Sequence, residues 1–172
     1  RNFCRDEFNI ARIIARPFVL NDGKFTRTEN RKDYALAPEE KTMLDKLSEF
    51  GYDVISVGKI KDIFCGQGIT KSFSAKNNKE GLDVIEQLIS QSFKGLVFAN
   101  LVGTDMIFGH RNDFKGYAQA LEYIDQRFAQ FLPKLSDGDV FIVCADHGCD
   151  PTTPSTDHSR EYIPLLIYSK NL

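Results

Sequence analysis

The feature that most constrains this 172-residue chain is an apolar segment that ends abruptly in polar, titratable side chains. Residues 140–145 have the composition of a buried strand, and Asp146 and His147 follow them directly. Gly148 then permits a sharp turn of the backbone. A second apolar segment of this kind covers residues 95–101. The pattern predicts that functional side chains gather at one edge of a sheet.

All three histidines of the chain lie a short distance after an acidic residue. The pairs are His110 with Asp105, His147 with Asp146, and His158 with Asp157. Imidazole and carboxylate groups together suit Zn²⁺, Mn²⁺ and similar divalent ions. A lone histidine is usually a surface or core residue, but three beside acids at predicted strand ends favour a metal site.

Helices and short apolar strands alternate along most of the chain. Apolar residues at spacings of three and four predict helices over 38–50, 80–92 and 112–132, and short apolar runs predict strands over 52–57, 95–101, 140–145 and 163–168. Residues 8–19 look extended, and residues 59–74 look like a glycine-containing loop. This alternation predicts an α/β fold with a parallel or mixed sheet covered on both faces.

Composition narrows the classes of partner. The net charge is −2 and the pI is near 5.9, so nothing indicates a nucleic-acid or membrane surface. No apolar run approaches the roughly 20 residues of a membrane span. The four cysteines show no CxxC spacing, which favours a reducing cytoplasm. Cys149 lies beside the predicted site, and we interpret it as a bystander rather than as a ligand or nucleophile.

Several segments resemble those of a known family. Three segments are similar to the metal-binding segments of the alkaline-phosphatase superfamily. They are Asp-Met-Ile-Phe-Gly-His at 105–110, Ala-Asp-His-Gly at 145–148 and Thr-Asp-His-Ser-Arg-Glu-Tyr-Ile-Pro at 156–164. Within this superfamily, the chain resembles the phosphopentomutase family specifically, at residues 12–18, 25–28, 57–60, 62–64 and 150–164. The resemblance covers nearly the whole chain. It implies a three-layer core with a mostly parallel sheet, plus a remnant of an inserted cap domain.

The resemblance also implies a ligand set for two divalent cations, most often Mn²⁺. Carried over by position, Asp105, His110 and His158 would bind one ion, and Asp146 and His147 would bind the other. In the family the second ion also needs an upstream Asp and a phosphorylated Thr. Neither is identifiable in the chain, which we therefore expect to be an internal fragment of low activity on its own.

The same resemblance divides the chain and suggests a substrate. Residues 1–36 would be the C-terminal part of the cap, and residues 37–172 the second part of the metal-binding core. Arg12, Ile14 and Arg16 would contact a sugar phosphate, because arginine forks suit phosphate oxygens. The family interconverts the 1-phosphate and 5-phosphate of ribose or deoxyribose through a phosphothreonine and a bisphosphate.

Two alternatives remain at this stage. Cofactor-independent phosphoglycerate mutases share similar metal segments but use a Ser nucleophile, and they fit residues 12–18 and 150–164 less well. The chain can also be a non-catalytic metal-binding module that lacks a nucleophile. Comparing the activity on ribose 1-phosphate with the activity on 3-phosphoglycerate distinguishes a phosphopentomutase from the first alternative. Mn²⁺ binding without turnover of either substrate identifies the second alternative.

Overall fold

A computed structural model describes residues 7–8, 10–28 and 32–171. Its centre is a three-stranded parallel sheet in the order β6-β5-β7, formed by β6 (Lys71–Phe73), β5 (Asp53–Val57) and β7 (Gly95–Ala99). Val57, the last residue of β5, pairs with Phe73 and with Ala99, the last residues of its neighbours. The carboxyl ends of the three strands therefore meet at one edge, where open α/β sheets bind their ligands.

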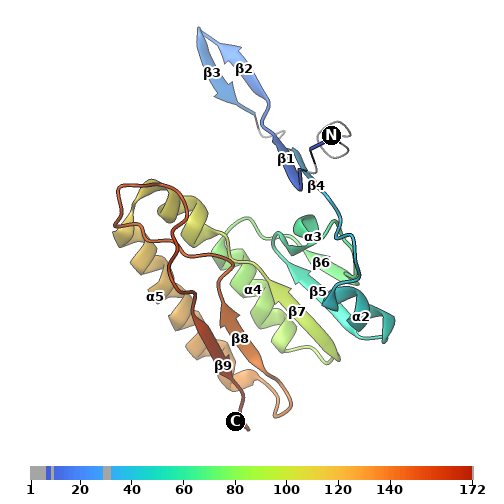
Figure 1. Cartoon of the computed structure of the whole chain (residues 1–172). Helices are drawn as coiled ribbons and strands as arrows, with labels where there is room; N and C mark the ends of the chain where they lie inside the picture. The colour runs from blue at the N-terminus through green and yellow to red at the C-terminus, as the bar shows by residue number, and fades with distance from the viewer. Residues whose placement is uncertain (1–6, 9, 29–31, 172) are drawn as a thin grey trace.

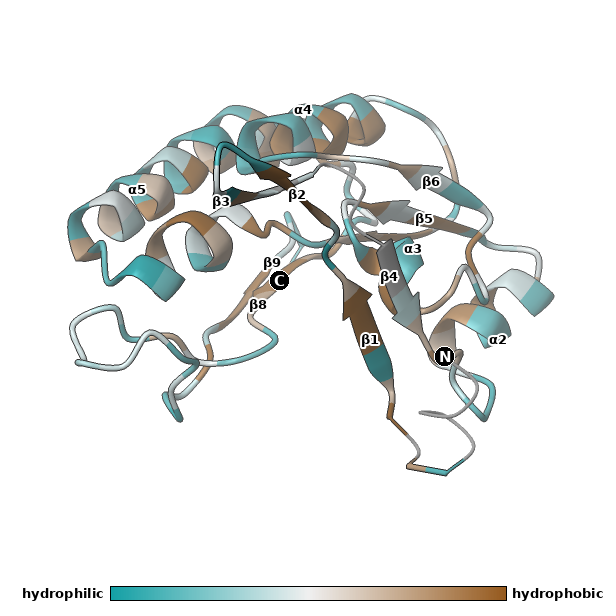
Figure 2. Cartoon of the chain, turned by 90° about the horizontal axis from the view of Figure 1, so that it is seen from above, coloured by the Kyte–Doolittle hydropathy of each residue, from teal (hydrophilic) through white to brown (hydrophobic). Residues whose placement is uncertain are grey.

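Helices cover both faces of this sheet (Figure 2). α4 (Asn78–Ile89) and α5 (Phe114–Phe131) lie on one face, and α2 (Met43–Glu49) lies on the other. Leu82 of α4 and Phe131 of α5 are fully buried in the cluster between these two helices. The predicted three-layer α/β arrangement is confirmed for this part of the chain.

Side-chain caps fix where the helices begin. Asp113 accepts a hydrogen bond from the Gly116 N–H, so α5 begins at Phe114, two residues after the predicted start. The prediction that the first helix begins at residue 38 is wrong. Thr42 and Asp45 form a capping box, so α2 begins at Met43.

The predicted loop over residues 59–74 contains two regular elements. These are α3 (Ile60–Ile63) and the edge strand β6. β6 has few apolar residues, and polar contacts attach it to β5, among them the 2.9 Å hydrogen bond between Ser56 and Ser72. A strand held by hydroxyl groups lacks the apolar pattern by which strands are predicted.

The last two predicted strands exist but do not join the parallel sheet. β8 (Phe141–Cys144) pairs antiparallel with β9 (Leu165–Tyr168) in a separate two-stranded sheet. All four residues of β9 are exposed although each is apolar or aromatic. Phe141 connects β8 to the core, because its ring packs against Phe131 at 5.7 Å. A short 3₁₀ helix, η3 (Leu132–Lys134), precedes this sheet.

The N-terminal extended segment forms two antiparallel ladders outside the α/β body (Figure 1). β1 (Arg12–Ala15) pairs with β4 (Lys32–Ala35), and β2 (Phe18–Asn21) pairs with β3 (Lys24–Arg27). Asp22 and Gly23 both have positive φ, as the tight turn between β2 and β3 requires. Part of the predicted cap segment, residues 1–6, 9 and 29–31, lies outside the described residues.

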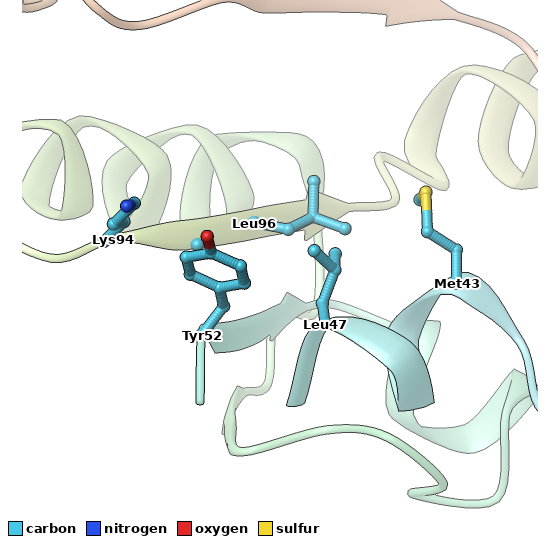
Figure 3. Close-up of a pocket in the computed structure, with 6 residues that line it drawn as sticks. Met43, Leu47, Tyr52, Lys94 and Leu96 are labelled. Atoms are coloured by element: carbon cyan, nitrogen blue, oxygen red, sulfur yellow. The ribbon is translucent and has the colours of Figure 1, made fainter. Parts of the chain in front are cut away.

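An apolar groove lies at the amino-terminal end of β7 (Figure 3). Leu47 of α2 faces Leu96 across it, Met43 of α2 also lines it, and Lys94 stands 5.2 Å from the centre of the Tyr52 ring at one end. The groove has no cluster of titratable groups and lies at the opposite end of the sheet from the predicted ligands. In the part of the chain that the structure describes, no helix is both long and apolar enough to cross a membrane.

Candidate metal centre

Asp105 lies on an unusual turn beyond the carboxyl end of β7. The chain continues from β7 into a single π-helical turn, η1 (Thr104–Phe108), and then into a 3₁₀ turn, η2 (Gly109–Arg111). π-Helical turns are rare and occur frequently at functional sites. The wide turn brings the carboxylate of Asp105 into a site where its side chain is only 31% exposed.

His110, on η2, is oriented as a metal ligand. Its Nδ1 lies 2.6 Å from the carbonyl oxygen of Thr156, and since a carbonyl can only accept, Nδ1–H donates. In the neutral ring the lone pair is then on Nε2, which lies 3.4 Å from Asp105 Oδ2. Metal-binding histidines characteristically donate their other N–H to a carbonyl or carboxylate in this way.

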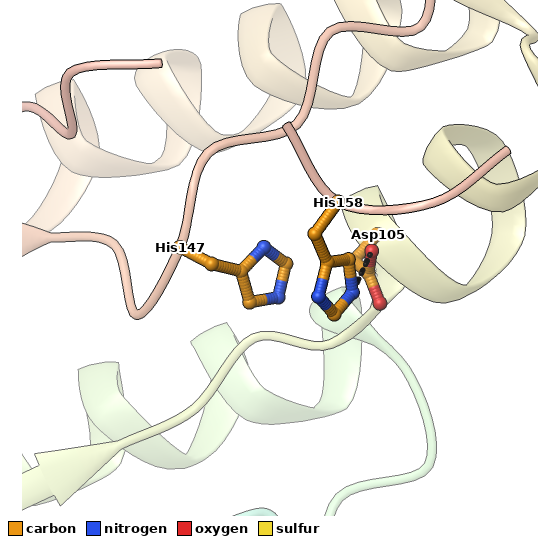
Figure 4. Close-up of side chains that lie close together, drawn as sticks. All are labelled: Asp105, His147 and His158. Carbon is orange, nitrogen blue, oxygen red and sulfur yellow. Dashed lines mark ion pairs between the residues drawn. The ribbon is translucent and has the colours of Figure 1, made fainter. Parts of the chain in front are cut away.

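His158 approaches the other oxygen of the same carboxylate (Figure 4). Its Nε2 lies 3.4 Å from Asp105 Oδ1. That oxygen is buried and has no hydrogen-bond partner among the described residues. A buried carboxylate oxygen without a partner is costly unless a cation compensates it. The donor set around Asp105 therefore fits a divalent ion.

His147 follows β8 and lies face to face with His158. The ring centroids are 3.5 Å apart and the planes differ by 15°. His147 Nδ1 lies 3.0 Å from the carbonyl oxygen of Gly148, so Nε2 carries the lone pair in the neutral ring. Nε2 also lies 3.7 Å from Asp146 Oδ1, and the Asp146 side chain is 72% exposed.

A backbone bridge closes the loop between these two histidines. The Ser159 N–H donates to the Gly148 carbonyl at 3.2 Å, and the Asp150 N–H donates to Ser159 Oγ at 2.8 Å. A Cβ on Gly148 would lie 2.6 Å from the Ser159 carbonyl oxygen, so glycine is required for this close approach. The bridge fixes His147 and His158, each one residue before a bridge partner.

The stacking of His147 on His158 determines whether both rings can bind one ion. Asp105, His147 and His158 each offer a donor atom, and the three atoms lie within 4.8 Å of one another. A ring nitrogen binds metal along its lone pair, in the ring plane. The His147 and His158 rings are nearly parallel and their centroids are 3.5 Å apart. An ion about 2.0–2.1 Å from a nitrogen of one ring, in the plane of that ring, therefore lies outside the plane of the other ring. In this stacked arrangement the two rings cannot bind the same ion.

Four of the five predicted ligands thus converge, namely Asp105, His110, His147 and His158. Asp146 contacts only its neighbour His147, and the predicted substrate residues do not join the cluster. Arg12 and Ile14 lie on β1 and Arg16 follows it, in the ladder outside the α/β body (Figure 1). The Thr156 carbonyl that orients His110 could not be predicted from the sequence, because any residue provides a carbonyl. Cys149 lies at the site, and burial, followed by the charges of Asp105 and Asp150, raises the pKa of its thiol.

Comparison with known proteins identifies the family. The sequence profile of the Metalloenzyme superfamily matches residues 9–172. The chain belongs to this superfamily. It is 54% identical over all 172 residues to a phosphopentomutase of Clostridium kluyveri, 52% to one of Carboxydothermus hydrogenoformans and 49% to one of Caldanaerobacter subterraneus subsp. tengcongensis. The resemblance predicted from the sequence is confirmed over the whole chain.

These matches cover the whole of this chain but only part of its relatives. The chain spans 44% of the length of each of these three phosphopentomutases. The fold is also similar to that of the PH0037 protein from Pyrococcus horikoshii, with a TM-score of 0.61 over 86% of this chain and 46% of that one. Identity to that protein is 17%, so the likeness concerns the fold alone.

Proposed function

We propose that the chain provides the histidine-bearing part of a phosphopentomutase. A phosphothreonine contributed by a segment outside the chain gives its phosphoryl group to a free hydroxyl of ribose (or deoxyribose) 1-phosphate or 5-phosphate. The resulting bisphosphate returns the other phosphoryl group to the threonine, so the net change is an isomerisation. The observation that carries the proposal is the half-buried Asp105 carboxylate between His110 and His158, in a chain 54% identical to a phosphopentomutase.

The ligands divide between two divalent ions, with Mn²⁺ as the expected metal. Asp105, His110 and His158 hold one ion, because both oxygens of Asp105 already face ring nitrogens. Asp146 and His147 hold the second, with further ligands from outside the chain. The stacking of His147 on His158 supports this division, because it directs their lone pairs into separate, adjacent planes. Two ions about 3.5–4 Å apart would stabilise the attacking and leaving oxygens of phosphoryl transfer.

The remaining parts of the chain take roles in substrate binding. Residues 37–172 form the second part of the metal-binding core, and residues 1–36 form the C-terminal part of a cap. Arg12, Ile14 and Arg16 bind the phosphate that is not being transferred. Their spacing of two places them on one face of an extended segment, which supports a shared ligand. We place the protein in the cytoplasm, in keeping with the free thiols of Cys65, Cys144 and Cys149.

A chimera tests the proposal directly. Residues 1–172 replace the matching segment of the Clostridium kluyveri phosphopentomutase, which aligns over the whole chain. We expect the chimera with Mn²⁺ to interconvert ribose 1-phosphate and 5-phosphate, and the isolated chain to show little turnover. His158→Ala in the chimera removes a ligand and should lower kcat at least about 100-fold, in the range expected for lost metal centres.

The alternatives predict other results from the same protein. A folded chimera that converts 3-phosphoglycerate in preference to ribose 1-phosphate would support the phosphoglycerate mutase alternative. A folded chimera that binds Mn²⁺ but turns over neither substrate would identify a non-catalytic metal-binding segment. Either result would contradict the proposed function.

A further inference from the structure

The turn that carries Asp105 is attached to α4 through one side chain. Asn78, the first residue of α4, accepts a hydrogen bond at 2.7 Å from the N–H of Gly103, which directly precedes η1. Gly103 is buried, and no side chain of its own caps η1. The amide of Asn78 therefore accepts from the backbone of a buried residue, two residues before Asp105.

The first turn of α4 packs closely against the segment that follows β7. A Cβ added to Gly103 would lie 2.6 Å from Asn78 Oδ1 and 2.8 Å from its Cγ. One turn further along α4, a Cβ on Gly81 would lie 2.7 Å from a methyl group of Leu101. The first turn of α4 and the segment that follows β7 are thus in contact at two neighbouring positions.

The start of α4 is itself held firmly. Asn77 caps the helix by accepting from the Glu80 N–H at 2.9 Å, and Glu80 accepts from the Lys76 N–H at 2.9 Å. Leu82, one turn into the helix, is fully buried in the core. Asn78 therefore projects from a fixed element, and a group positions a ligand well only when its own support is rigid.

We propose that Asn78 is a positioning residue for the metal centre. Its amide oxygen fixes the Gly103 N–H and, through it, the orientation of the π-helical turn, so that both oxygens of Asp105 face His110 and His158. The inference rests on the proposed function, because it concerns the ion that Asp105 binds. It assigns to α4, which contributes no ligand, a role in metal affinity.

Titration calorimetry with Mn²⁺ on the chain, well below its unfolding temperature, tests the role. Asn78→Ala removes the acceptor and should weaken the tight site about 10-fold, as loss of an outer support of a metal ligand does. Asn78→Asp keeps an acceptor oxygen and should bind nearly as the wild type does. Asn77→Ala is the matched control, since it destabilises the same helix end but leaves the Asn78 amide in place; it should keep the affinity.

Three results would overturn the inference. These are unchanged Mn²⁺ affinity in Asn78→Ala, equal weakening in Asn78→Ala and Asn77→Ala, or failure of Asn78→Asp to restore binding. If Asn78→Ala does not fold, Gly103→Ala decides, because its Cβ displaces the same amide and should also weaken binding; unchanged affinity there would contradict the proposal. A wild-type chain that binds no divalent ion would overturn the proposed function as well.

Discussion

Two strands of this molecule, β5 and β9, are both rich in apolar residues but have opposite surroundings. Four of the five residues of β5 are buried, because the strand is central in its sheet and has helices on both faces. All four residues of β9 are exposed, because among the described residues β9 pairs with β8 alone. The comparison teaches that apolar sequence predicts a strand, whereas the elements around it determine whether that strand stabilises the fold.

The same difference divides the metal centre. Asp105 and His110 follow β7, which is paired to the buried β5. His147 and His158 lie in the segment between β8 and β9, the poorly covered sheet. One half of the site is therefore supported by the core, and the other half depends on the Gly148–Ser159 bridge and the hydrogen bond between His110 and Thr156.

The largest expected effect is on stability, and it tests the contrast between the two regions. Leu82→Ala opens a cavity in a fully buried cluster and should lower the free energy of unfolding by about 2–5 kcal/mol. Leu166→Ala, in β9, removes a side chain that is 61% exposed and should cost less than about 0.5 kcal/mol. Urea denaturation measures both changes. Equal costs would show that β9 is covered in solution and would break the comparison.

Much of the α/β body could be predicted because its signals are local. Apolar spacing located α4, α5, β5 and β7 to within a few residues. The pairing of β8 with β9 was not predicted, because the choice between joining a sheet and forming a separate one depends on contacts distant in sequence.

The ligand types could likewise be predicted, since few residue types bind divalent ions. Their arrangement could not. The stacking of His147 on His158 follows from a backbone bridge between Gly148 and Ser159, and neither residue has a side chain that indicates it. The π-helical turn at Asp105 has no recognised sequence pattern here, and the hydrogen bond from Gly103 to Asn78 spans 25 positions.

A smaller effect is expected on the pH dependence of stability, through the ion pairs between α4 and α5. Hydrogen bonds from Lys79 and then Arg127 lower the pKa of Asp83, and those from Lys134 and then Arg127 lower the pKa of Glu86. A carboxyl group with a lower pKa in the folded state stabilises above its unfolded pKa of about 4, and this contribution is lost as pH falls through the folded value. Stability should therefore decline below about pH 4–5.

Unfolding midpoints in urea between pH 7 and pH 3 measure this decline. The double variant Asp83→Asn with Glu86→Gln should be less stable at pH 7 and lose less on acidification. Asp150, whose pKa is lowered by hydrogen bonds from Thr152 in the loop near His158, provides the comparison. Asp150→Asn should leave the pH dependence of global unfolding nearly unchanged. The reverse pattern would place the stabilising carboxylates in the poorly covered region.

Mn²⁺ calorimetry on three forms of the chain tests the central claim, that Asp105, His110 and His158 share one ion and His147 belongs to another. The wild type should show at most one tight site, because Asp146 and His147 alone are too few ligands for the second ion. His110→Ala should abolish that site, and His147→Ala should leave it nearly intact. Two equally tight sites in the wild type, or loss of binding in His147→Ala but not in His110→Ala, would contradict the account.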